Sequence, residues 1–384
     1  MPALPPTLNQ MLAGLIGTPS VSSTHPDRDQ SNRPVLDLLA AWLADLGFRI
    51  EILELPGQPN KANLIATLGQ GPGGLVLAGH SDTVPYDGHL WRHDPFRVTE
   101  ADGRLYGLGT CDMKAFFALA IEAARGLDAR ALRQPLVILA TADEESAMHG
   151  ARALADAGRP LGRHALIGEP TNLRPVRLNK GVMGEAIRLI GRSGHASDPS
   201  LGRSALEGMH AVLTEILSWR DELARTYRHP AFAIPYPTIN PGHIHGGDNA
   251  NRICGECELH LDLRLLPGLD PETLRTELAR RTAAIAEPRD LRWEVVPLFP
   301  SIPPAETPAG TAIIRAAEEL TGHQAEAVGF GTEAPFFNRL GLETVVLGPG
   351  DIAQAHQPDE YLEIARIPPT IALLEGLIRR FCLT

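Results

Sequence analysis

The sequence predicts an α/β protein whose mixed, largely parallel sheet is flanked by helices and whose chain is interrupted by a smaller inserted domain. Its 384 residues are too many for one ordinary core, and 43% of them are hydrophobic. In the first half, short apolar runs alternate with helical patterns, which is typical of a largely parallel sheet. Near residue 180 the pattern changes to strand, helix, strand, strand, helix, strand.

In the first half, each expected element follows from its hydrophobic spacing. Apolar residues recur at helical intervals from Val35 to Leu46. The later elements are strands over 48–55, 63–68, 75–78 and 136–142, and helices over 114–127 and 147–157.

The inserted segment has elements of its own. Residues 182–190 alternate like a strand with one exposed face, and 204–223 form a long helix. Strands over 238–245, 252–266 and 291–296 and a helix over 271–286 complete an open-faced α+β sandwich of ferredoxin-like order. We therefore expect one domain made of residues 1–179 and 297–384, and an inserted domain of residues 180–296.

Composition excludes several classes of function. The net charge of −11 argues against a nucleic-acid partner, because such surfaces need clustered Lys and Arg. Apolar runs stay shorter than a membrane span, so we expect no membrane partner. Four cysteines in so long a chain suit the reducing cytoplasm. Cys254 and Cys257 form a lone C-x-x-C, which is more typical of buried thiols than of a zinc ribbon.

Histidines and acidic residues follow the apolar runs at five places. These places hold, in chain order, His80 with Asp82, then Asp112, then Asp143 with Glu144 and Glu145, then Glu169, and finally His356. Open α/β sheets bind ligands beyond the carboxyl ends of their strands. We therefore expect these side chains to meet at one edge of the sheet.

Grouped carboxylates repel one another, and a dication removes that penalty. Mixed histidine and carboxylate ligands suit zinc, and also cobalt or manganese. Two metals need a bridging carboxylate, and a further carboxylate is needed to take a proton from water. Each residue alone could be a loop acid or a core histidine, and Glu144 and Glu145 could cap the following helix. The five places together favour a metallohydrolase.

Seven motifs make the chain resemble the M20 metallopeptidase family, and within it the acetylornithine deacetylases. They are Gly79-His-Ser-Asp-Thr-Val-Pro, Trp91-Arg-His-Asp-Pro-Phe, Leu105-Tyr-Gly-Leu-Gly-Thr-Cys-Asp-Met-Lys, Thr141-Ala-Asp-Glu-Glu, Ile167-Gly-Glu-Pro-Thr, Arg192-Ser-Gly-His-Ala-Ser and Gly331-Thr-Glu-Ala. They occur in family order over most of the chain. Cys111 departs from the pattern, because a small residue such as Ala often stands there, and its thiol could bind metal or oxidise.

The resemblance implies a zinc-peptidase-like catalytic domain with two zinc ions per subunit, for which cobalt can substitute. The implied ligands are His80, Asp112 as the bridge, Glu145, Glu169 and His356. Asp82 is expected to accept a hydrogen bond from the free nitrogen of His80. Glu144 is expected to be the general base and acid.

The implied reaction is hydrolysis of N2-acetylornithine to ornithine and acetate in arginine biosynthesis. The alternatives within the family are acetylcitrulline deacetylation, succinyl-diaminopimelate desuccinylation, dipeptide cleavage or hydrolysis of another N-acyl amino acid. A non-catalytic scaffold of the same fold is a further alternative, which the complete ligand set disfavours.

The resemblance also implies a homodimer formed through the inserted domain, which would then act as a dimerisation or lid domain. His195 would reach the partner's site and stabilise the oxyanion, although it could instead be a loop residue at a helix start. Asn249 and Arg264 are candidates for binding the substrate carboxylate. Glu333 would lie near the basic end of the substrate, or would cap the helix that follows it.

Overall fold

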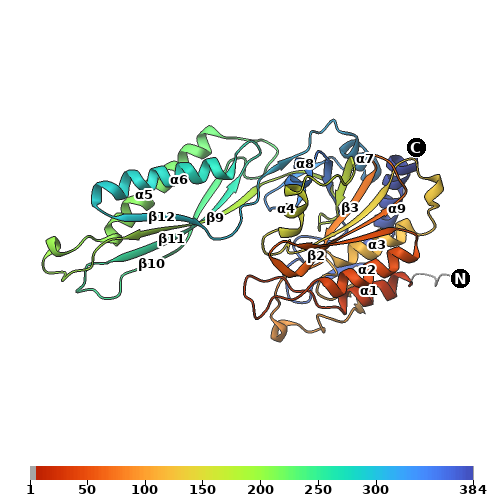
Figure 1. The fold of residues 1–384 in the computed structure, drawn as a ribbon, viewed down its shortest axis with the longest axis horizontal. Coiled ribbons are helices and arrows are strands. Elements are labelled where there is room, and N and C mark those ends of the chain that lie inside the picture. The colour runs from red at the N-terminus through yellow and green to blue at the C-terminus, as the bar shows by residue number, and fades with distance from the viewer. Residues whose placement is uncertain (1–5, 384) are drawn as a thin grey trace. The chain divides into compact units, whose positions relative to one another are not determined.

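The computed structural model describes residues 6–383 and divides into two compact units (Figure 1). The first unit contains the chain up to Arg177, Thr307–Glu326 and the chain from Glu333 onward. The second contains Leu178–Glu306 and Ala327–Thr332. It therefore extends beyond the expected range of 180–296. The first five residues of the expected catalytic domain, and residue 384, lie outside the described residues.

The first unit is built on a mixed sheet in the order β1-β2-β6-β3-β7-β15-β8. Its strands are β1 (Arg49–Leu55), β2 (Gln58–Leu68), β6 (Leu136–Thr141), β3 (Leu75–His80), β7 (His164–Ile167), β15 (Glu343–Val346) and β8 (Val176–Asn179). The central pairs β6–β3, β3–β7 and β7–β15 are parallel, whereas β1–β2 and β2–β6 are antiparallel. The predicted largely parallel sheet is confirmed.

Helices flank this sheet. Helices α1 (Leu8–Ile16), α2 (Arg33–Asp45), α3 (Lys114–Ala124), α7 (Ala312–Thr321) and α9 (Ile367–Ile378) contribute to one large hydrophobic core with the strands. Helices α4 (His149–Asp156) and α8 (Ala334–Arg339) pack against each other. None of the helices among the described residues is long and apolar enough to cross a membrane.

The second unit is an antiparallel sheet of order β10-β11-β9-β12 covered by two helices (Figure 1). The strands are β10 (Thr238–Gly246), β11 (Glu256–Leu265), β9 (Gly181–Ile190) and β12 (Arg292–Pro297), and the helices are α5 (Ala205–Thr226) and α6 (Pro271–Ala286). The helices bury apolar residues against one face of the sheet. The strand expected over 252–266 begins only at Glu256, because residues 253–255 form a loop.

Several short strands were not expected. Strands β4 (Thr99–Ala101), β5 (Arg104–Tyr106) and β16 (Tyr361–Glu363) form a small antiparallel sheet. Strands β13 (Ala305–Glu306) and β14 (Glu326–Val328) pair with β8. Segments of two or three residues are too short to show a hydrophobic period.

Candidate metal centre

Strands β6, β3 and β7 end side by side, and each is followed by candidate ligands. His80 closes β3 and pairs in register with Thr141 at the end of β6, while Ala78 pairs with Ile167 at the end of β7. The three strands are parallel, so the segments that follow them start from the same edge of the sheet. The parallel order thus brings together residues that lie far apart in the sequence.

The carboxylate of Asp112 lies between two histidines. Its Oδ1 is 3.0 Å from Nε2 of His80, and its Oδ2 is 3.5 Å from Nε2 of His356. Nε2 of His356 is also 3.0 Å from Oε2 of Glu145. His80, Asp112 and Glu145 each offer a ligand atom within 4.8 Å of the others. One carboxylate that faces two imidazoles has the arrangement a bridging ligand needs.

Glu169 belongs to the same buried group of charges. Its Oε1 has no hydrogen-bond partner among the described residues. Burial raises the pKa of Glu169 well above its usual range, and the nearby Asp112 raises it further while His80 opposes the shift. A buried carboxylate oxygen without a partner is costly, and a metal ion would satisfy it. Two imidazoles and three carboxylates are a donor set that fits zinc.

The main chain, and not the carboxylate, of Asp82 orients His80. Nδ1 of His80 donates to the carbonyl oxygen of Asp82 at 3.0 Å, while Oδ1 of Asp82 lies 3.7 Å away. This bond still leaves Nε2 of His80 as the ligand atom. The Asp82 carboxylate instead accepts from the main-chain N–H of Glu144 at 3.3 Å and of Glu145 at 3.1 Å. It therefore fixes the loop that carries both glutamates.

The loop after β6 is held on its other side by a buried lysine that the sequence did not reveal. Asp143 adopts a left-handed conformation with φ of 57°. Its Oδ1 is 2.8 Å from Nζ of the buried Lys61 and accepts from Oγ of Ser22 at 3.0 Å. The half-buried Glu144 follows directly, and burial raises its pKa well above the usual range, with Glu169 adding to the shift. The residues on either side of Glu144 are thus both held in place, Asp143 by Lys61 and Glu145 by Asp82, and they keep Glu144 beside the ligands.

Glu360 organises the segment that carries Asp112. Its Oε1 accepts main-chain N–H bonds from Gly109 at 3.0 Å, Cys111 at 2.7 Å and Asp112 at 3.0 Å. It lies four residues after His356, so one side chain ties together two ligand-bearing segments. An acidic residue close behind a candidate ligand was the only sequence signal for this role.

Cys111 is a buried thiol that bonds to the main chain of another segment. Its Sγ donates to the carbonyl oxygen of Asp351 at 3.3 Å. Burial raises the pKa of the thiol far above its usual value, and the charges of Glu360 and Asp112 raise it further. Both effects favour the neutral thiol over the thiolate.

Glu333 lies among the buried carboxylates. It is fully buried, and its Oε2 accepts from Oγ1 of Thr141 at 3.0 Å. Burial raises its pKa to about 7. Glu333 directly precedes α8, but its side chain makes no capping bond to that helix.

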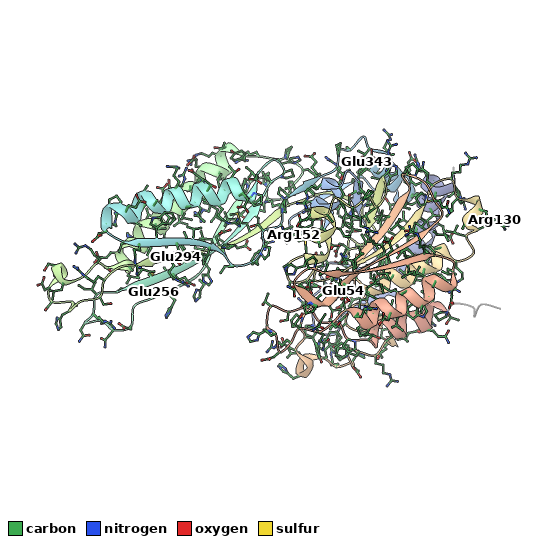
Figure 2. All side chains as sticks on the ribbon, viewed as in Figure 1. Glu54, Arg130, Arg152, Glu256, Glu294 and Glu343 are labelled. Carbon is green, nitrogen blue, oxygen red and sulfur yellow. The ribbon has the colours of Figure 1, made fainter. Side chains whose placement is uncertain are left out.

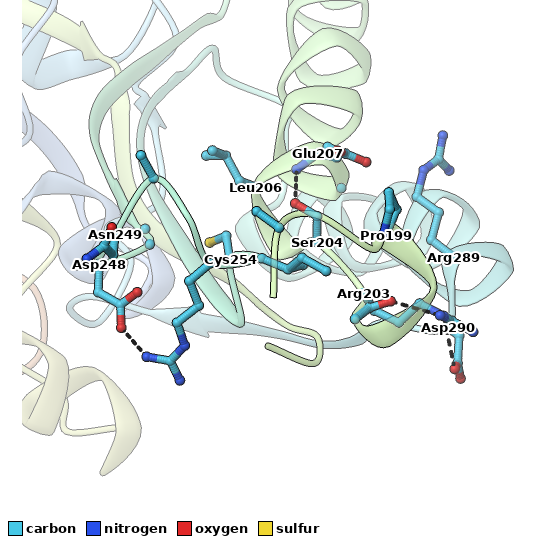
Figure 3. Close-up of a pocket in the computed structure, with 18 of the residues that line it drawn as sticks. Pro199, Arg203, Ser204, Leu206, Glu207, Asp248, Asn249, Cys254, Arg289 and Asp290 are labelled. Atoms are coloured by element: carbon cyan, nitrogen blue, oxygen red, sulfur yellow. Dashed lines mark hydrogen bonds and ion pairs between the residues drawn. The ribbon is translucent and has the colours of Figure 1, made fainter. Parts of the chain in front are cut away.

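The other three predicted residues belong to the second unit. Nδ1 of His195 accepts from the main-chain N–H of Ser197 at 3.2 Å, so the neutral ring carries its proton on Nε2. Asn249 lines a pocket of about 1050 Å³ in this unit (Figure 3). Arg264, on β11, is bound to its neighbour Asp262 at 2.8 Å and 3.1 Å.

Comparison with known proteins gives a consistent result. The profile of peptidase family M20/M25/M40 matches residues 76–380, which is most of the chain. The fold is similar to that of an M20 family metallo-carboxypeptidase from Sulfolobus solfataricus, with 18% identity, a TM-score of 0.75 and coverage of 97% of this chain and 99% of that one. The aminopeptidase PepT from Bacillus cereus is similar at 21% identity and a TM-score of 0.74, with 97% and 98% covered.

A third solved structure is the YXEP protein of Bacillus subtilis, described as a dinuclear metal binding peptidase. It is 18% identical to this chain, with a TM-score of 0.65 and 97% of each chain covered. The shared fold extends over both units of the chain.

Proposed function

Because the chain belongs to peptidase family M20/M25/M40, we propose that it is a metal-dependent hydrolase that cleaves an amide bond of an N-acylated amino acid. The observation that carries this proposal is the Asp112 carboxylate, which faces His80 with one oxygen and His356 with the other. Two zinc ions held by these residues with Glu145 and Glu169, or cobalt in their place, would polarise the amide carbonyl and lower the pKa of water. The shared fold of a dinuclear metal binding peptidase supports the proposal.

Glu144 is the proposed general base and acid. It lies beside the ligand Glu145, and the Asp82 carboxylate fixes the main chain of both residues. In this position its carboxylate takes a proton from the attacking water and later transfers it to the leaving nitrogen. The Nε2–H of His195 is the proposed donor to the developing oxyanion.

The proposed substrate is N2-acetylornithine, which would give ornithine and acetate as a step of arginine biosynthesis in the cytoplasm. This choice is supported by the sequence motifs around the metal ligands. Asn249 and Arg264 are the proposed contacts of the substrate carboxylate, and Glu333 would face its basic end. Because Arg264 is paired with Asp262, it would have to exchange that partner for the substrate.

Substrate rates on purified, zinc-loaded protein test this proposal. The panel contains acetylornithine, acetylcitrulline, acetylmethionine, succinyl-diaminopimelate and a dipeptide. We expect the highest kcat/KM for acetylornithine, and loss of activity after chelation with recovery when zinc is restored. Full activity of the metal-free protein would contradict the metal-dependent mechanism. A higher kcat/KM for the dipeptide would leave the mechanism intact but make the chain a peptidase.

A further inference from the structure

The sheet of the second unit has one face that its helices leave uncovered. Helices α5 and α6 pack on the other face, where β11 contributes Leu259 and Leu261 to the core. Side chains alternate along a strand, so the residues between these leucines point to the uncovered face. There β10 presents His243 and His245, and β11 presents Glu258 and His260.

The strand register places these four side chains in two facing pairs. His243 is opposite His260, and His245 is opposite Glu258. Directly opposite residues of an antiparallel pair have Cβ atoms about 4.5–5.5 Å apart. The rings of His243 and His260 have centroids 4.7 Å apart, which confirms that they share a face. Nε2 of His260 is 2.6 Å from Oε1 of Glu258.

We propose that His243, His245, Glu258 and His260 form a second metal site, which binds a divalent transition ion, with zinc as the ion that this donor set fits best. Three imidazoles and one carboxylate supply the four ligands of a tetrahedral zinc site. This site uses no residue of the first unit and is independent of the proposed hydrolase activity. The first unit provides a parallel, because candidate ligands there also contact one another, with His80 3.0 Å from Asp112.

The site is accessible, and its ligands can move. His243 and His245 are exposed and, together with Glu258, line a groove of about 770 Å³. Among the described residues, only His80, Asp112 and Glu145 already hold three ligand atoms within 4.8 Å of one another, so His243 and His245 would have to change rotamer to bind one ion with Glu258 and His260. An ion bound there would take the place of the hydrogen bond between Nε2 of His260 and Oε1 of Glu258.

The charges around Glu258 favour a cation and orient the carboxylate. Nε of Arg188 donates to Oε2 of Glu258 at 2.8 Å, which leaves Oε1 directed at His260. Arg188 also lies 3.4 Å from Glu256 and 3.6 Å from Glu294, both labelled in Figure 2. Three carboxylates thus surround one guanidinium, so its positive charge is more than balanced. A partner that holds a metal-binding carboxylate in place commonly strengthens the site.

Zinc content of the full-length protein, measured after dialysis against buffered free zinc, tests the proposal. At a free-zinc concentration that just fills the wild-type sites, we expect the wild type to hold up to one zinc ion per chain more than His245→Ala or His243→Ala. Loss of an outer partner of a ligand weakens metal binding about 10–100-fold, so loss of a ligand should weaken this site at least as much. Affinity should also fall in acid, because a protonated imidazole cannot bind metal.

His210→Ala is the matched control, because His210 is an exposed histidine on α5, outside the cluster. It should hold as much zinc as the wild type. Circular dichroism checks that all three variants are folded. Equal zinc content of the wild type and both cluster variants at every free-zinc concentration would overturn the proposal. So would a loss of zinc that the His210→Ala control shares.

Discussion

Glu144 and Glu145 are sequence neighbours with different surroundings. Glu145 contacts His356, whereas within the described part of the chain Glu144 makes no side-chain bond to either histidine of the centre. We expect Glu144→Gln to lower kcat by about 10²–10⁴, the usual contribution of a positioned acid–base group. Its zinc content should stay at the wild-type level, because the ligand set is unchanged. Steady-state kinetics together with metal analysis measure both quantities.

Glu145→Gln is the control for this prediction, since it makes the same chemical change one residue away. It should lose zinc as well as activity, because an amide is a poorer ligand than a carboxylate. A Glu144→Gln enzyme within tenfold of the wild-type kcat would remove Glu144 from the mechanism.

Glu360 gives a second test at the scale of single residues. Burial raises the pKa of Glu360 to about 8, and the three main-chain N–H groups that its carboxylate accepts oppose this shift by favouring the charged form. A glutamine amide would keep the shape but could not carry the charge. Hydrogen bonds to charged groups contribute about 1.5–3 kcal/mol, so Glu360→Gln should lower the free energy of unfolding by an amount of that order. It should also weaken zinc binding by about 10–100-fold, because the Asp112 segment loses its support.

Thermal denaturation of metal-free protein and a zinc titration measure these two effects. Glu363→Gln is the matched control, because Glu363 is an exposed glutamate three residues further along. We expect that variant to resemble the wild type in both measurements. If Glu360→Gln also does, the main-chain bonds of Glu360 do not support the centre.

The candidate ligands were visible in the sequence for a physical reason. A histidine or an acid that directly follows an apolar strand must lie at the end of the sheet, so His80 and Glu169 could be predicted from pattern alone. The residues that support these ligands could not be predicted from the pattern. Lys61 lies within β2, and its contact with Asp143 depends on the pairing of β2 with β6. Asp82 was expected to hold His80 with its side chain, but the turn after β3 directs its carbonyl oxygen there instead.

At the scale of elements, helices α5 and α6 are joined by one largely buried arginine. Arg281 on α6 donates to Glu277 on its own helix at 2.6 Å, and to Glu215 and Glu222 on α5 at 2.8 Å each. Only 14% of its side chain is exposed. We expect Arg281→Met to lower the free energy of unfolding by about 1.5–3 kcal/mol, because charge-assisted bonds between the helices are lost. Urea denaturation measures this difference.

Arg280→Met is the matched control for the arginine prediction. Arg280 binds the same Glu277 at 2.7 Å, but 64% of its side chain is exposed. Exposed ion pairs contribute little to stability, so the control should change the urea midpoint much less. Equal effects of the two substitutions would show that the link between the helices is not what stabilises the unit.

The difference in the free energy of unfolding between the wild type and Arg281→Met should also depend on pH. The hydrogen bond from Arg280 is the largest cause that lowers the pKa of Glu277 from 4.5 to about 2, and the bond from Arg281 lowers it further. A carboxylate whose pKa is lower in the folded state stabilises the fold above its unfolded pKa, and this contribution is lost as the pH falls toward its folded pKa. The stability gap between the wild type and Arg281→Met should therefore be constant near pH 7 and shrink below about pH 4.5. Urea denaturation at pH 7, 5 and 4 measures it, and a gap that widens toward acid would contradict the role of Glu277.

Long elements could be predicted from sequence and short ones could not. The expected helix over 114–127 is α3, and the expected strand over 136–142 is β6, each within a few residues. The small sheet of β4, β5 and β16 was missed, although β16 directly follows Glu360 and pairs with the strand before Gly107. Its pairing is long-range, so no local pattern encodes it.

At the scale of the whole molecule, the chain presents an open sheet edge that a second copy could occupy. Strand β10 is the edge strand of the second unit, and Ile244 on it is 51% exposed. An exposed edge with an apolar residue is a template for pairing with another strand. A two-fold axis would pair β10 with itself, which supports the proposed homodimer.

The position of His195 makes the dimer proposal testable through catalysis. Every proposed ligand of the catalytic metal centre lies in the first unit, whereas His195 lies in the second. Its Nδ1 is an acceptor, so Nε2 can donate to an oxyanion. We expect that the partner subunit supplies this donor, in keeping with the proposed dimerisation through the second unit. Glu144→Ala and His195→Ala would then each be inactive alone, because every site in either homodimer lacks one group.

Mixing the two variants tests this arrangement. In a mixed dimer with donation in trans, one site contains both substitutions and the other contains neither. Half of the dimers in a fully exchanged equal mixture are mixed, so about a quarter of wild-type activity should return. If each subunit used its own His195, every site would keep one defect and exchange would restore nothing. Exchange is verified independently by mass spectrometry of differently labelled subunits. A monomer by light scattering, or verified exchange without recovered activity, would show that His195 does not act in trans.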